Sequence, residues 1–110
     1  MIVRLAENAP VFAALGDATR LRIVVRLCQE GPLSIVRLAQ GAKVSRQAIA
    51  KHLQVLEAAG VARGFRTGRE SIWELRSNQL LQVQRYVLQI SRDWDAALNR
   101  LRKFVEQSEQ

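Results

Sequence analysis

Residues 45–60 read SRQAIAKHLQVLEAAG, a stretch that begins and ends like a helix. Ser45 is a typical N-cap residue, and Gly60 is the residue type that often follows the last turn of a helix. Four side chains recur at intervals of three and four and therefore share one face: Ile49, His52, Leu53 and Leu56. The pattern predicts a helix with one packed face and one exposed face.

The exposed face of this helix carries cations and amides: Arg46, Gln47, Lys51 and Gln54. Arginine pairs bidentately with guanine and glutamine with adenine, so Arg46 and Gln47 in the first turn are candidates for reading base edges. We expect Lys51 and Gln54 to contact phosphates or flanking bases, and Ser45 to offer a phosphate its hydroxyl or backbone N–H. The alternative is an ordinary solvated face that lacks acidic residues.

Two further helices are predicted before this stretch. Asp17 is placed to cap a helix that ends at Gly31, and Pro32 prevents its continuation. Ser34 is placed to cap a brief helix that ends at Gly41. The brief helix, a tight turn and the helix after Ser45 make residues 34–59 a predicted helix-turn-helix.

Lys43 lies in the tight turn and is predicted to contact phosphate rather than a base. After Gly60 the hydrophobic period changes to two, which predicts two strands around Thr67-Gly68-Arg69. Residues 61–76 thus form a predicted β-hairpin wing. Arg66 and Arg69 bracket its turn and are candidates for minor-groove or phosphate contacts, the alternative being charge that serves only solubility.

The helical period returns from about Ser77 to Glu106. Apolar side chains are spaced there by three and four, like the seam of a helix that packs along another: Leu80, Val83, Val87, Ile90, Trp94, Ala97, Leu101 and Phe104. Such a helix is roughly 40 Å long, more than the preceding residues can cover. We expect the same helix of a second copy to cover it, joined by the N-terminal residues 1–15.

Length and charge are those of one basic domain spanning residues 1–110. The chain has a formal net charge of +7, which favours a polyanionic partner, with nucleic acid preferred to an anionic membrane surface. No apolar run approaches the ~20 residues of a membrane-spanning helix, and the N-terminus does not resemble a signal peptide. A cytoplasmic protein is the expectation.

Residues for metal or catalytic chemistry are few. Cys28 is the only cysteine and His52 the only histidine. We expect Cys28 to be a small buried side chain and His52 to pack with a hydrogen bond from its ring. No titratable pair has a third orienting group, and no glycine-rich phosphate loop is present. The sequence predicts no catalytic site, no cofactor and no metal site.

Three segments together resemble the ArsR/SmtB family of bacterial winged-helix repressors: LGDATRLRIVVRL at 15–27, SRQAIAKHLQVLEAAGV at 45–61 and FRTGRESIWEL at 65–75. The resemblance implies a mainly α winged helix-turn-helix fold with a small β-hairpin, dimerising through its terminal helices on an inverted-repeat operator. It places Ser45, Arg46, Gln47 and Lys51 on the DNA-contacting helix and Arg66 and Arg69 on the wing. His52-Leu53 matches a His-Leu pair of the family.

The chain departs from the metal-sensing members of that family. Where arsenic sensors have Cys-x-Cys, residues 32–36 read PLSIV, and the last helix offers only Asp93 and Asp95 where zinc sensors have Asp and His. Helical side chains two residues apart do not share a face, so this pair is poorly placed for chelation. The resemblance therefore favours a metal-independent member and points to no particular inducer.

The sequence thus predicts a sequence-specific, homodimeric DNA-binding regulator, most simply a repressor. Two alternatives stay open. One is a redox- or metal-responsive repressor that uses Cys28 from both copies. The other is a protein or RNA interaction module, because a fold alone does not determine function.

Overall fold

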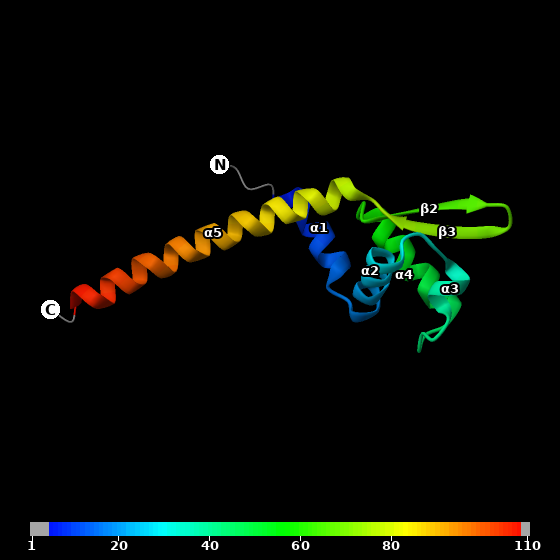
Figure 1. Ribbon diagram of the computed structural model, residues 1–110, viewed down its shortest axis with the longest axis horizontal. Coiled ribbons are helices and arrows are strands. Elements are labelled where there is room, and N and C mark those ends of the chain that lie inside the picture. The colour runs from blue at the N-terminus through cyan, green and yellow to red at the C-terminus, as the bar shows by residue number, and fades with distance from the viewer. Residues whose placement is uncertain (1–4, 109–110) are drawn as a thin grey trace.

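The computed structural model describes residues 5–108, so residues 1–4 of the predicted dimerisation segment lie outside the described residues. Five helices and three short strands follow one another in this part of the chain. Figure 1 shows how they are arranged. They are α1 (Leu5–Leu15), α2 (Ala18–Glu30), β1 (Leu33–Ser34), α3 (Ile35–Ala39), α4 (Arg46–Ala58), β2 (Ala62–Thr67), β3 (Glu70–Leu75) and α5 (Ser77–Ser108). The predicted mainly α fold with a β-hairpin is confirmed.

Helices α2, α3 and α4 start directly after the predicted N-cap residues. Asp17, Ser34 and Ser45 precede α2, α3 and α4, and each side chain accepts a hydrogen bond from the backbone amide three residues on. The distances are 3.0 Å for Asp17 and 3.1 Å for both serines. Each cap satisfies an amide that would otherwise lack a partner in the first helical turn.

The sheet has three antiparallel strands in the order β1-β3-β2. The hairpin of β2 and β3 turns at Gly68, whose φ of 61° favours glycine. The sequence prediction missed β1, in which Leu33 pairs with Trp73 and Ser34 with Ile72. A strand of two residues shows no hydrophobic period, so its pairing with β3 depends on the tertiary fold.

The core is built where the helices meet the sheet. Its largest fully buried side chains come from α1, from α4 and from the residue before β2: Val11, Ile49, Leu53, Leu56 and Val61. Three of the four side chains predicted for the packed face of α4 are therefore fully buried, and the fourth, His52, is half-buried. Burial on one side makes α4 a rigid support for its other side.

Cys28 is exposed, so the expectation of a buried thiol is wrong. The buried face of α2 consists of Ile23, Val24 and Leu27. Successive helical residues are rotated by about 100°, which carries Cys28 from the centre of that face to its solvent flank.

Helix α5 leaves the body of the protein and extends far beyond it (Figure 1). Its 32 residues make it roughly 48 Å long at 1.5 Å per residue. Leu80 and Val83 at its start pack against the core, and the Tyr86 ring lies 5.8 Å from that of Phe12 in α1. No described residue of α5 is fully buried, so most of its apolar side chains stand in solvent.

Candidate nucleic-acid interface

Helices α3 and α4 form the predicted helix-turn-helix. These two helices pack against each other. Helix α2 holds α3 in place through Arg26, whose guanidinium forms an ion pair with Glu30 of the same helix at 2.9 Å. The same guanidinium donates to the backbone carbonyl of Arg37 in α3 at 3.1 Å. This side chain therefore joins the end of α2 to α3, the helix that supports α4.

All the predicted contact residues of the turn and of α4 are exposed: Lys43, Ser45, Arg46, Gln47, Lys51 and Gln54. Within residues 5–108, Lys43, Arg46 and Lys51 form no ion pair with the chain itself, so their charges are available to a partner. The Ser45 hydroxyl oxygen caps α4, which leaves its proton free to be donated. The first turn of α4 thus presents donors and cations to solvent.

The wing carries Arg66 and Arg69 at its tip, and both are exposed. The Arg66 guanidinium donates to the Arg69 backbone carbonyl at 3.4 Å, so the two residues lie next to each other. In Figure 1 the tip of the wing and the turn before α4 both lie at the end of the molecule opposite the C-terminus of α5. The basic residues of both elements therefore belong to one end of the protein.

The wing is also held to α4, by contacts that the sequence did not indicate. Glu57 near the end of α4 accepts a hydrogen bond from the backbone amide of Gly64 at 3.1 Å. A Cβ at Gly64 would lie 2.8 Å from the Trp73 ring of the neighbouring strand, so only glycine fits there without displacing the ring. The Glu57 hydrogen bond sets the wing's position relative to α4, whereas the Trp73 ring packs over Gly64 within the wing itself.

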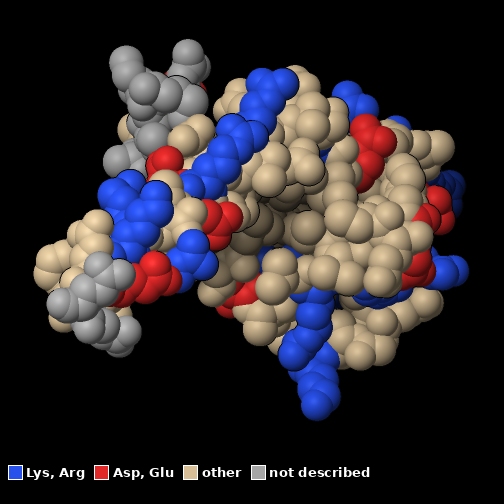
Figure 2. Space-filling model, turned by 60° about the vertical axis from the view of Figure 1, so that its left-hand side comes forward, with Lys and Arg blue, Asp and Glu red and all other residues tan. Residues whose placement is uncertain are grey.

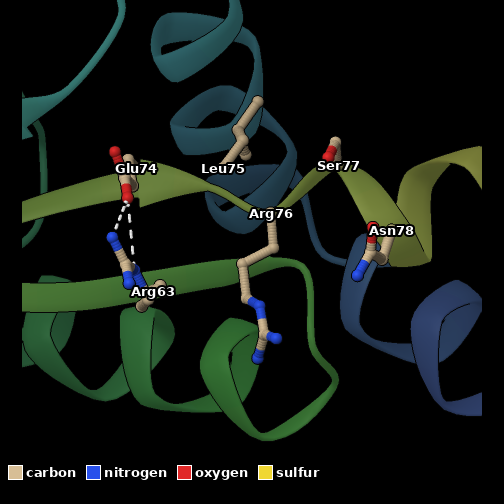
Figure 3. A pocket seen from close by; sticks show the side chains of 6 residues that line it. All are labelled: Arg63, Glu74, Leu75, Arg76, Ser77 and Asn78. Carbon is tan, nitrogen blue, oxygen red and sulfur yellow. Dashed lines mark hydrogen bonds and ion pairs between the residues drawn. The ribbon is translucent and has the colours of Figure 1, made fainter.

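A further pair stiffens the base of the wing. Arg63 in β2 forms an ion pair with Glu74 in β3, and its guanidinium lies 5.5 Å from the centre of the Phe65 ring. Figure 3 shows this pair beside a polar hollow of about 250 Å³ between the wing and the start of α5, lined also by Leu75, Arg76, Ser77 and Asn78. None of the predicted DNA-contacting residues lines this hollow.

Positive charge alone does not mark the interface. On the face shown in Figure 2, Lys and Arg side chains stand out from both the body and α5, with Asp and Glu interspersed. What distinguishes the α4 end is the combination of an exposed helix start, amide side chains and a nearby basic wing. This combination suits base edges and phosphates in one groove of a duplex.

The described part of the chain contains no group of three or more His, Cys, Asp or Glu side chains arranged to hold a metal ion. Asp93 and Asp95 lie two residues apart on α5, as the sequence predicted, and the Asp93 carboxylate accepts a hydrogen bond from Gln89 at 3.1 Å. None of the helices described is both long enough and apolar enough to cross a membrane.

A helix-turn-helix followed by a β-hairpin wing defines a winged helix-turn-helix protein, a class that places its second helix in the major groove. Comparison with known proteins agrees. A family model described as a helix-turn-helix domain matches residues 15–64. An HTH-type transcriptional regulator of Mycobacterium tuberculosis is 32% identical over 95 residues, covering 86% of this chain and 85% of the relative.

A second relative, the HTH-type transcriptional repressor SmtB of Mycobacterium tuberculosis, is 33% identical over 73 residues, covering 66% of this chain and 53% of its own length. The solved structure of an ArsR-like transcriptional regulator from Rhodococcus sp. RHA1 superposes with a TM-score of 0.77 and 37% identity, covering 94% of this chain and 96% of that one. The chain belongs to the ArsR/SmtB family of winged helix-turn-helix transcriptional regulators.

Proposed function

We propose that this protein is a homodimeric repressor that binds an inverted-repeat operator in duplex DNA and reads it with the first turn of α4. The observation that carries this proposal is the exposed start of α4, with Arg46 and Gln47 held outward by a fully buried opposite face. Arg46 matches the acceptors of guanine, and Gln47 matches the donor and acceptor of adenine.

The remaining predicted contacts position the protein on the duplex. Lys43 and Lys51 carry free charges beside the first turn of α4, and we assign them to phosphates on either side of the groove. Gln54 lies a turn further along the same face and is assigned to a flanking base or phosphate. Arg66 and Arg69 at the wing tip are assigned to the backbone or minor groove next to it.

The dimer is proposed from the exposed apolar side chains of α5. Five of the predicted interface residues are between 45% and 69% exposed: Val87, Ile90, Trp94, Leu101 and Phe104. Leu80 and Val83 pack on the core of their own chain, so they lie behind the proposed interface and hold α5 to that core. Leu98 and Val105 are exposed on the same side of α5 and extend the predicted set.

A second copy of α5 is the simplest cover for a helix of this length, because a two-fold pair buries the same stripe on both copies. Such a dimer presents two α4 helices to the duplex, and its operator has two half-sites about 10 bp apart, or a multiple of that spacing. We further propose that binding needs no metal and takes place in the cytoplasm.

Selection of bound fragments from a random duplex pool tests the readout. The wild-type protein is expected to enrich an inverted repeat. Gln47→Ala removes a bidentate partner, so base preference should relax by ~1–3 kcal/mol at one position of each half-site and stay unchanged elsewhere.

Gln82→Ala provides the matched control, because Gln82 is an exposed amide on α5, outside the proposed interface. It should select the wild-type sequence. If Gln47→Ala also selected the wild-type sequence with undiminished preference, the assignment of base readout to the first turn of α4 would be wrong.

A further inference from the structure

One arginine on α2 contacts both α1 and α4. The Arg20 Nε–H donates to the backbone carbonyl of Ala14 in α1 at 2.6 Å, and its Nη1 lies 3.2 Å from Nδ1 of His52 in α4. We call the contacts among Ala14, Asp17, Arg20 and His52 the Arg20 bridge. Arg20 and His52 are both half-buried, so these hydrogen bonds are partly shielded from water.

The geometry defines the protonation of the His52 ring. A guanidinium can only donate hydrogen bonds, so Nδ1 of His52 must accept from Arg20. An accepting Nδ1 carries no proton, and the ring is therefore neutral with its hydrogen on Nε2. The bridge as seen requires this form of the ring.

Asp17 completes the bridge. Its Oδ2 lies 3.8 Å from His52 Nδ1 and accepts the Arg20 backbone amide at 3.0 Å. This amide hydrogen bond lowers the pKa of the Asp17 carboxyl, and the charge of Arg20 acts in the same direction. The charged groups beside the ring are Asp17, the N-cap of α2, and Arg20 in α2, and the Ala14 carbonyl of α1 accepts from Arg20.

The place of His52 gives the bridge its role. His52 directly follows Lys51 on α4, and Leu53 after it is fully buried, so the ring lies at the border of the packed face. We propose that Arg20 is a positioning residue for DNA recognition, which holds α4 at a defined orientation against α1 and α2 through His52. This inference depends on the proposed function, because the orientation matters only if α4 reads DNA.

Loss of the Arg20 bridge should weaken binding to the specific site relative to other duplexes, because α4 is then no longer held in the orientation that reads the bases. A change in net positive charge by itself acts on binding to all duplexes alike.

The measured quantity is the ratio of affinities for the duplex selected by the wild-type protein and for a scrambled duplex of the same length. Arg20→Met should lower this ratio at pH 7.5 by about tenfold, the effect of a lost charge-assisted hydrogen bond. Arg22→Met is the matched control, because Arg22 is exposed on the same helix and its loss removes the same charge. It should lower both affinities alike and leave the ratio unchanged.

Two more variants separate positioning from general destabilisation. Arg20→Lys keeps the charge but lacks the planar fork that donates in two directions, and it should also lose specificity. His52→Asn keeps an acceptor oxygen near the place of Nδ1, so its ratio should stay near the wild-type value.

The proposal is overturned if Arg20→Met and Arg20→Lys retain the wild-type ratio, or if His52→Asn lowers the ratio as far as Arg20→Met does. Amide hydrogen exchange of Ile49 and Leu53 in α4 provides a readout without DNA. It should speed up in Arg20→Met and not in Arg22→Met. If the wild-type protein showed no preferred duplex, the proposed function would fail, and the exchange rates would still decide whether Arg20 holds α4.

Discussion

Trp94→Ala tests the proposed dimer most sharply, because Trp94 lies midway along the exposed stripe of α5 and is 65% exposed in one chain. An aromatic side chain can bury about 200 Å², so roughly 130 Å² of the Trp94 side chain is available for burial against a second chain. Burying that area is worth ~3 kcal/mol at ~25 cal/mol per Å². A two-fold dimer contains two copies, or ~6 kcal/mol in all. If the second chain covers half of that surface, Trp94→Ala reduces the free energy of dimerisation by ~3 kcal/mol. This raises the dimer dissociation constant by about 200-fold.

Sedimentation equilibrium over a range of protein concentrations measures this constant. Arg92→Ala is the control, because Arg92 is exposed two residues earlier and so lies on the opposite face of α5. It should leave the constant unchanged. The reasoning is refuted if the wild-type protein is a monomer at concentrations of tens of micromolar, or if Trp94→Ala dimerises as strongly as Arg92→Ala.

Three further perturbations have defined outcomes. Arg69→Ala should weaken binding to all duplexes alike and reduce the slope of log affinity against log salt by ~1, measured by titration at several salt concentrations. Ser45→Ala removes the cap of α4 and should lower the free energy of unfolding in urea by ~1 kcal/mol. Asp17→Asn should be less stable than the wild type at neutral pH. Because the pKa of Asp17 is lowered on folding, that difference should shrink as the pH falls below about 4, which thermal unfolding at stepped pH can follow.

Local signals in the sequence were enough to predict the helix-turn-helix and the wing. An N-cap involves residues within three positions of one another, and one face of a helix shows within seven positions. The capping role of Ser45 and the packed face of α4 could therefore be predicted directly from the sequence. The turn at Gly68 is local in the same way, because its positive φ favours glycine. These elements place the candidate contacts at one end of the molecule.

Features that depend on distant residues could not be predicted in this way. Arg20 and His52 are 32 residues apart, and nothing near either residue indicates their hydrogen bond. In the sequence, Glu57 cannot be distinguished from any solvated carboxylate on a helix, because only the fold brings its partner Gly64 within hydrogen-bonding distance. The exposure of Cys28 and the pairing of β1 likewise follow from how α2 and β3 pack in the complete fold.

Titration of the wild-type protein with the selected duplex and with its scrambled counterpart, across a range of salt, tests the central claim most directly. A dimer that reads two half-sites through Arg46 and Gln47 should bind the selected inverted repeat at least ~1,000-fold more tightly than the scramble at each salt concentration. Equal binding of both duplexes, falling steeply together as salt rises, would contradict sequence-specific recognition and leave only the attraction of a basic surface for a polyanion.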